Sequence, residues 1–185
     1  MKVGTLGIIG YGSFGSFVHE LARYYTPEIA VRVHSSRSQP DGKTFFSLEG
    51  VCKSDMLVLA IPISAFEEQL QKVIPLVGGQ TVVVDIATVK MHTTNILKQY
   101  KNKLRYVAMH PMFGPYSYLK KGRKLDGLRV VFTDYTIEQS EYELFRVLRE
   151  RRSPISVGGG TTGGAGRWGC GASDAAARST SRTAS

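Results

Sequence analysis

The stretch Gly10-Tyr11-Gly12-Ser13-Phe14-Gly15 decides the fold class because of the segments on either side of it. Residues 5–9 before it form a short apolar run, which is typical of a strand buried on both faces. After it, apolar residues recur at the spacing of one helix face, at Phe17, Val18, Leu21, Ala22 and Tyr25. The stretch therefore predicts a strand, a tight glycine-rich turn and an amphipathic helix in direct succession.

The three glycines of this turn match a pattern that holds dinucleotides in α/β folds. Gly10 permits the tight turn, Gly12 lets backbone N–H groups approach a pyrophosphate, and Gly15 allows the helix to pack on the strand. The start of the helix adds partial positive charge for the phosphates. We therefore expect all six residues of the stretch to bind the cofactor. The alternative, a glycine-rich turn with a purely structural role, stays open.

The chain up to residue 152 continues to alternate between strand and helix patterns. Strands are expected at 30–34, 56–61, 81–86, 104–109 and 128–133, and helices at 45–51, 64–74, 91–100 and 137–152. A capping box, Ser64-Ala65-Phe66-Glu67, marks the start of the helix at 64–74. Apolar strands that alternate with helices form parallel sheets covered on both faces. We expect an α/β fold with a doubly wound, mostly parallel sheet of the Rossmann type and helices on both faces.

The composition changes sharply after Arg152. With 185 residues the chain has room for one ordinary domain, which we place at residues 1–152 and expect to bind a dinucleotide. Of the 33 residues from 153 to 185, 24 are Gly, Ala, Ser or Thr, so this segment buries too little apolar surface to offset its chain entropy. We expect residues 153–185 to be a disordered, low-complexity tail, and we interpret it as a truncated or out-of-frame end.

Charge and cysteine content exclude several classes of function. The net charge of +9 favours anionic ligands, but no aromatic-interleaved basic motif is present, so we expect phosphate-bearing small molecules and no nucleic acid. No apolar run has the length of a membrane span or of a secretory leader. Cys52 and Cys170 lack a second cysteine at the short spacing of a metal site. These features predict a cytoplasmic protein without a bound metal.

The residues after the second strand indicate which nicotinamide cofactor is bound. NAD-binding folds carry an Asp or Glu here, which accepts hydrogen bonds from the ribose. This chain has Ser35-Ser36-Arg37 and no acid. A guanidinium flanked by hydroxyls suits the 2′-phosphate of NADP, so we expect NADP rather than NAD. The alternative is that Arg37 is only a solvated loop cation.

Chemistry-bearing residues follow the next three strands, at the sheet edge where ligands bind in doubly wound folds. Ile61 and Pro62 end the third strand and are expected to pack against the cofactor. Asp85-Ile86-Ala87-Thr88-Val89-Lys90 follows the fourth strand, and His110-Pro111-Met112-Phe113-Gly114-Pro115 follows the fifth. A hydroxyl, a lysine and a histidine therefore converge on one rim. Lys90 is open to two interpretations, an attractor for an anionic substrate or a solvated cation at a helix start.

Together these motifs, in this order and spacing over about residues 3–150, resemble those of prephenate and arogenate dehydrogenases. The run from His110 is the specific part, and beside Ser35–Arg37 it is similar to the NADP-using arogenate branch. The resemblance implies NADP-dependent oxidative decarboxylation of arogenate or prephenate in tyrosine biosynthesis. It also implies that His110 accepts the hydrogen bond and finally the proton of the substrate hydroxyl. Thr88 matches a position that is usually Ser, where the hydroxyl helps to position histidine and substrate.

The chain departs from this family after residue 152. Relatives carry a second, largely helical domain that builds a homodimer and closes the cleft, and this chain has only residues 153–185 in its place. With one wall of the cleft missing, we expect nucleotide binding to survive and turnover to be weak or absent. Two alternatives stay open. One is a catalytically silent NADP-binding module made by truncation, and the other is a different small-substrate NADP reductase, such as an imine or hydroxyacid reductase, although those lack the run from His110.

Overall fold

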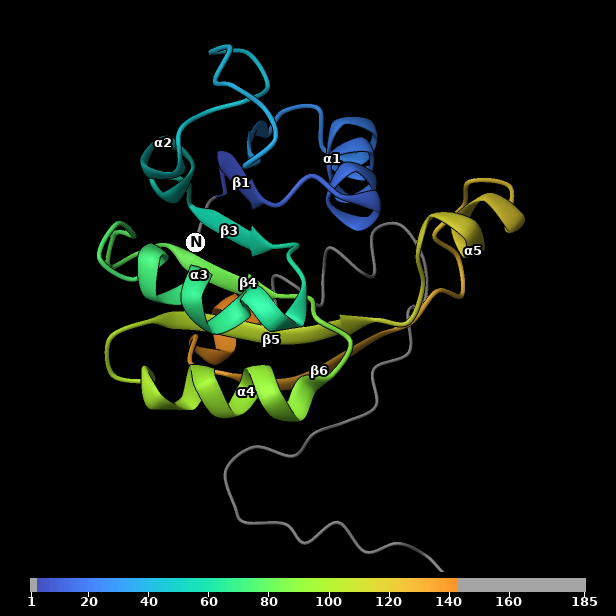
Figure 1. Cartoon of the computed structure of the whole chain (residues 1–185). Coiled ribbons are helices and arrows are strands. Elements are labelled where there is room, and N and C mark those ends of the chain that lie inside the picture. The colour runs from blue at the N-terminus through green and yellow to red at the C-terminus, as the bar shows by residue number, and fades with distance from the viewer. Residues whose placement is uncertain (1–2, 143–185) are drawn as a thin grey trace, which may run out of the picture.

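The computed structural model describes residues 3–142, which form one six-stranded sheet (Figure 1). The strands are β1 (Thr5–Ile9), β2 (Ala30–His34), β3 (Met56–Leu59), β4 (Val82–Asp85), β5 (Arg105–Pro111) and β6 (Val130–Tyr135), in the spatial order β2-β1-β3-β4-β5-β6. The first five are parallel, and β6 pairs antiparallel with β5. The expected doubly wound, mostly parallel α/β fold is confirmed.

Helices cover both faces of the sheet, as its apolar strands require. They are α1 (Ser13–Tyr25), α2 (Leu48–Cys52), α3 (Phe66–Val73), α4 (Lys90–Gln99) and α5 (Pro115–Lys120), with a short 3-10 turn, η1 (Ile63–Ala65), before α3. Side chains of α2, α3 and α4 share one buried cluster with the sheet, and α1 packs into a second cluster on the opposite face. Figure 1 shows α3 and α4 in front of the strands.

The strand β4 shows why a strand covered by helices on both faces is apolar. All four of its residues are buried, because helices cover both of its faces. Val83 belongs to the cluster with α3 and α4, whereas Val82 and Val84 belong to the cluster with α1. Side chains alternate between the faces of a strand, so Asp85 lies on the same face as Val83.

Several local expectations differ from the structure, among them element bounds such as those of β3, which ends at Leu59 rather than at residue 61. The capping box predicted at Ser64 is wrong, because this residue lies inside η1 and neither η1 nor α3 has a side-chain cap hydrogen bond. The helix α5 has no counterpart among the predicted helices; it begins at Pro115, and Ser117 Oγ accepts a hydrogen bond from the Gly114 N–H at 3.1 Å. The strand β6 begins at Val130 rather than at residue 128. It runs antiparallel because the chain returns through the short α5 without a crossover helix on the sheet.

The last described residues, 139–142, are helical, where the sequence predicts its final helix. The remainder of that helix and the predicted tail at 153–185 lie outside the described residues.

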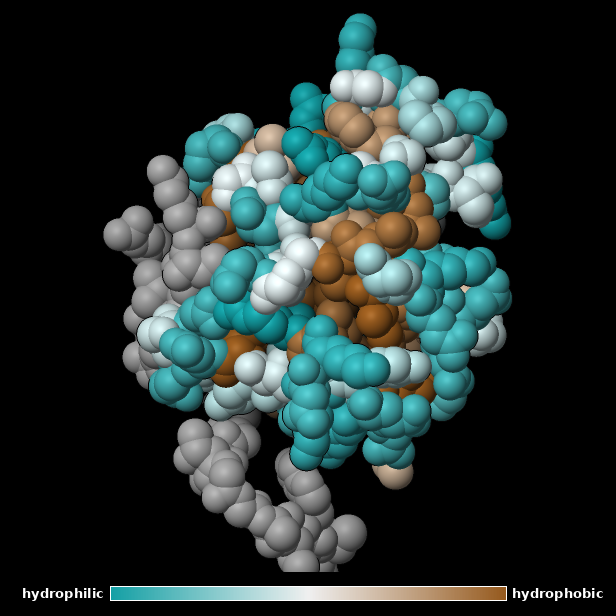
Figure 2. Space-filling model, turned by 90° about the vertical axis from the view of Figure 1, so that its left-hand side faces the viewer, coloured by the Kyte–Doolittle hydropathy of each residue, from teal (hydrophilic) through white to brown (hydrophobic). Residues whose placement is uncertain are grey.

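The carboxyl ends of the parallel strands meet at one edge of the sheet, beside which α5 projects on an arm (Figure 1). Large apolar side chains are exposed in the segments at this edge, among them Val89, Met91, Met112, Tyr116 and Leu119. Figure 2 views the opposite side, where the strands begin, and shows an apolar area ringed by polar residues. Within residues 3–142, the helices are too short or too polar to span a bilayer.

Candidate functional site

A cleft of about 560 Å³ opens at the carboxyl ends of β1, β3, β4 and β5. Seven residues expected to bind the cofactor or act in catalysis line it: Gly12, Ser13, Phe14, Ile61, Pro62, Thr88 and His110. In the sheet, β2 lies on one side of β1 and β3 lies on the other, so the strand order reverses at β1. The cleft lies at this point of reversal. Such a position is the usual ligand site of open α/β sheets.

The glycine turn between β1 and α1 is fixed by close backbone packing. Gly10 has a φ of +98°, and a Cβ atom there would lie 2.3 Å from the carbonyl oxygen of Ala60. A Cβ atom on Gly15 would lie 2.0 Å from the carbonyl oxygen of Gly10. The Gly10 N–H also donates to the carbonyl oxygen of His34, at 2.9 Å. Only glycine fits at these two positions, and the turn therefore brings the start of α1 close to the ends of β2 and β3.

Gly12 differs from its two neighbours, because a Cβ atom there would meet no protein atom within 4 Å. It is the N-cap of α1, with no side-chain cap hydrogen bond and no acidic residue in the first turn. The backbone N–H groups at the start of α1 are thus left for another acceptor. Gly12, Ser13 and Phe14 line the cleft, so this helix start fits an anionic group placed there.

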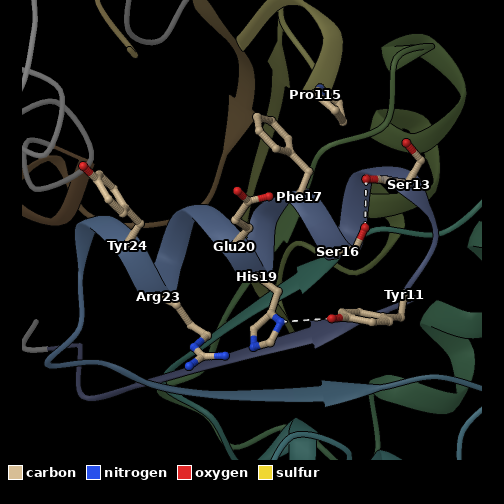
Figure 3. Close-up of a pocket in the computed structure, with 9 residues that line it drawn as sticks. All are labelled: Tyr11, Ser13, Ser16, Phe17, His19, Glu20, Arg23, Tyr24 and Pro115. Atoms are coloured by element: carbon tan, nitrogen blue, oxygen red, sulfur yellow. Dashed lines mark hydrogen bonds between the residues drawn. The ribbon is translucent and has the colours of Figure 1, made fainter. Parts of the chain in front are cut away.

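Tyr11 turns away from the cleft, into a second hollow of about 700 Å³ along α1 (Figure 3). Its hydroxyl lies 3.2 Å from Nδ1 of His19, and its ring packs edge-on against Phe45. His19 is buried, which the apolar spacing of α1 does not reveal. Neither Thr88 nor His110 lines this hollow. The side chain of Tyr11 therefore supports the turn from the α1 side and does not contribute to the cleft.

The residues Ser35-Ser36-Arg37 form a turn directly after β2, outside the lining of the cleft. The Arg37 N–H donates to Ser35 Oγ at 3.2 Å, and the side chains of Ser36 and Arg37 are exposed. The hydrogen bond from Gly10 to His34 joins this turn to the glycine turn. The two turns therefore lie next to each other, as a cofactor that contacts both requires.

His110 lies near the end of β5, between Thr88 and the segment that leads to α5, and lines the cleft. Its Nδ1 atom is buried and has no hydrogen-bond partner among the described residues. Burial lowers the pKa of His110 from its ordinary 6.5, and the Lys90 ammonium lowers it further, while the Asp85 carboxylate acts in the opposite direction. The imidazole is therefore neutral at neutral pH and can accept a proton.

Thr88 stands at the exposed tip of the loop between β4 and α4. Beneath it, Asp85 is fully buried and accepts hydrogen bonds from the Ala87 N–H, the Lys90 ammonium and the Thr93 hydroxyl. The Lys90 side chain is 11% exposed. The interpretation of Lys90 as a solvated cation is wrong, because its ammonium is buried and paired with Asp85. Attraction of an anionic substrate by Lys90 stays a prediction.

Several residues of the site lie in the runs that follow β3, β4 and β5 but have no individual role predicted from the sequence. Asp85 is the central acceptor of the loop, and its signal is a carboxylate at the end of an otherwise apolar strand. Phe113, Gly114, Ile63 and Ile86 also line the cleft, and each directly follows a strand or its loop. Among residues 3–142, no group of three or more His, Cys, Asp or Glu side chains could hold a metal ion.

A family model described as the nucleotide-binding domain of prephenate dehydrogenase matches residues 41–146 of this chain. The matched segment is more than half of the 185 residues. It begins after the glycine turn and contains the loops that carry Thr88 and His110.

A probable arogenate/prephenate dehydrogenase from Methanocaldococcus jannaschii is 29% identical to this chain over 70 residues. The match covers 37% of this chain and 16% of that relative, so the chain spans a small part of its length.

Solved structures of enzymes share the fold. The prephenate dehydrogenase of Aquifex aeolicus has a TM-score of 0.63 at 19% identity, with 84% of this chain and 61% of that chain covered. The same enzyme has also been solved in complex with hydroxyphenyl propionate and NAD⁺. An imine reductase from Myxococcus stipitatus, in complex with NAD⁺, has a TM-score of 0.61 at 16% identity, with coverage of 85% and 54%. At these identities the likeness shows the fold and not the activity.

We predict that the imidazole of His110 titrates below 6.5 in an NMR titration, with His110→Gln used to assign its resonances. Because the native pKa lies below the unfolded one, the unfolded state binds more protons between the two values, so stability is lost as the pH falls through about 6.5. Burial also lowers the pKa of His19. On acidification, His110→Gln should therefore lose less stability than the wild type, but still lose some. A His110 resonance that titrates at or above 6.5 would contradict this assignment.

Proposed function

This chain belongs to the family of prephenate dehydrogenase nucleotide-binding domains, and on that premise we propose that it binds NADP in the cleft and supplies the histidine for oxidative decarboxylation of arogenate or prephenate. The family match covers the loops with Thr88 and His110 and agrees with the resemblance that they carry. One observation supports the proposal most strongly: the start of α1 and His110 line the same cleft. A phosphate-binding turn and a neutral proton acceptor can therefore serve one bound cofactor and its substrate.

The residues of the cleft fit a dinucleotide. The open space beside Gly12 and the uncapped start of α1 suit a pyrophosphate, which Gly12, Ser13 and Phe14 would hold. Ile61 and Pro62 supply apolar wall against the rest of the cofactor. When bound, the nicotinamide ring supplies the acceptor for a hydride.

His110 and Thr88 provide the polar groups for the substrate. The neutral imidazole of His110 accepts the hydrogen bond of the substrate hydroxyl and takes its proton as the hydride leaves the same ring carbon. The hydroxyl of Thr88, which lines the same cleft as His110, helps to orient the substrate. Loss of CO₂ then makes the ring aromatic, which draws the reaction toward product.

NADP is proposed over NAD on the residues that follow β2. The turn Ser35-Ser36-Arg37 offers an exposed guanidinium and hydroxyls next to the glycine turn, and no carboxylate that would repel a 2′-phosphate. The solved Aquifex aeolicus enzyme is in complex with NAD⁺. That complex describes the cofactor of that enzyme and does not decide the cofactor of this chain.

A second candidate function is a catalytically silent NADP-binding module. The chain spans 61% of the Aquifex aeolicus enzyme, and the matching family model describes the nucleotide-binding domain alone. The third possibility, a different reductase, has support from the fold shared with the imine reductase. The run from His110 to Pro115 favours the prephenate and arogenate class over that reading.

We predict that Gly12→Ala weakens NADP binding by about tenfold or more, because the added methyl group occupies the space of the pyrophosphate. Its stability should change by less than about 0.5 kcal/mol, because the methyl group meets no protein atom within 4 Å. Gly15→Ala is the contrasting variant and should lose stability, since its Cβ atom would lie 2.0 Å from Gly10 O. Calorimetric titration and urea unfolding measure both. Unchanged NADP affinity in Gly12→Ala would exclude the glycine turn as the phosphate site.

We predict that Arg37→Ala lowers the affinity for NADP by about 10- to 100-fold, the scale of a lost hydrogen bond to a charged group, and leaves the affinity for NAD unchanged. Lys53→Ala is the control, because Lys53 is also an exposed cation and pairs with Glu49. Titration of both nucleotides into each variant measures the effect. A preference for NADP that survives in Arg37→Ala would reject the assignment of Arg37.

We predict slow turnover of arogenate or prephenate by this chain, followed by NADPH absorbance. His110→Asn should lower the rate by about 10²- to 10⁴-fold, the usual loss for a general base, without a change in NADP affinity. Full turnover by His110→Asn would refute the catalytic role. NADP binding without any turnover by the wild type would select the silent module.

A further inference from the structure

Lys90 donates hydrogen bonds to both the side chain and the backbone of Asp85. Its Nζ atom donates to Asp85 Oδ2 at 2.6 Å and to the backbone carbonyl oxygen of Asp85 at 3.1 Å. The Lys90 side chain is 11% exposed and the Asp85 side chain is 0% exposed. A buried ion pair of this kind holds its geometry far more firmly than the exposed pairs of the same protein, such as Lys72 with Glu68.

These contacts close the loop from Asp85 to Lys90. Inside the loop, Asp85 Oδ1 accepts the Ala87 N–H at 2.8 Å. At its far end, the Thr93 hydroxyl donates to Asp85 Oδ2 at 2.6 Å and ties the loop to α4. Thr88 and Val89 are left exposed at the tip, with Thr88 in the lining of the cleft. The position of Thr88 is therefore set by Ala87, directly before it, and by Lys90, two residues after it, both of which are hydrogen-bonded to Asp85.

The same contacts place a charge pair beside His110. Asp85 is the register partner of Ala108 on the neighbouring parallel strand. His110 is two residues beyond Ala108, so it lies on the same face of the sheet as Asp85, the face that α4 covers. Among the described residues, the lining of the cleft holds no Asp, Glu, Lys or Arg side chain. Asp85 and Lys90 are therefore the charges that act on the imidazole from β4 and α4.

We infer that Lys90 is a positioning residue: through Asp85 it fixes the Thr88 loop at the cleft, and it forms with Asp85 a charge pair on the face of the sheet that carries His110. The inference rests on the proposed roles of Thr88 and His110. It assigns to the lysine a function that needs no contact with substrate or cofactor. The electrostatic part agrees with the direction in which Lys90 moves the pKa of His110, downward, against the upward effect of Asp85.

The test compares Lys90→Met, Asp85→Asn and the double variant Asp85→Asn/Lys90→Met with the wild-type chain and no cofactor present. NMR measures the pKa of His110 and the hydrogen exchange of the Ala87 amide. Lys72→Met is the control, because it removes an exposed ion pair on α3. The double variant removes both charges and remains informative if Lys90→Met, which leaves a buried carboxylate without its cation, fails to fold.

The pKa of His110 should rise in Lys90→Met and fall in Asp85→Asn, and in the double variant it should be higher than in Asp85→Asn. Exchange at Ala87 should accelerate about tenfold or more in both Lys90 variants, the scale of a lost hydrogen bond to a charged group. An unchanged pKa of His110 in Lys90→Met, a pKa in the double variant no higher than in Asp85→Asn, or unchanged exchange at Ala87 in the Lys90 variants would overturn the inference. Titration of NADP into the wild type separates the two proposals, because failure to bind NADP rejects the proposed function and leaves these measurements standing.

Discussion

The structure depends on the close approach of two backbones at the turn between β1 and α1. A Cβ atom added to Gly15 would lie only 2.0 Å from the Gly10 carbonyl oxygen, so no larger residue fits there. The helix therefore begins directly against the turn. This contact fixes where the positive end of α1 lies relative to the ends of β2 and β3. Gly12 has open space around it and is not required by the protein's own packing, and we propose that a bound pyrophosphate requires it.

Parallel strands bring the rest of the site to this helix start. Because β1, β3, β4 and β5 run in one direction, the loops after them meet at a single edge, although Gly12 and His110 are far apart in sequence. The buried pair of Asp85 and Lys90 then holds the loop that carries Thr88. The apolar lining keeps His110 in a partly desolvated environment, where the neutral imidazole is favoured.

Much of this arrangement follows from local sequence patterns. Apolar runs that alternate with helical spacing predict the sheet, and strand ends predict which loops share an edge. Other features depend on contacts that a sequence does not display. Lys90 is buried because the fold places the start of α4 against Asp85 at the end of β4. Tyr11 points toward α1 because His19 and Phe45 contact it there. The segment of α5 and β6 contains no long run of apolar residues at helical spacing. The sequence pattern therefore does not show whether the chain returns antiparallel, as it does, or through a crossover helix to a parallel strand.

The most direct measurement is a crystal structure of this chain with NADP⁺. We expect the pyrophosphate to lie on the backbone N–H groups at Gly12 to Phe14, with the 2′-phosphate at Arg37 and the nicotinamide ring facing His110. A cofactor bound elsewhere on the molecule, or a nicotinamide ring turned away from His110 with the cleft left empty, would contradict it.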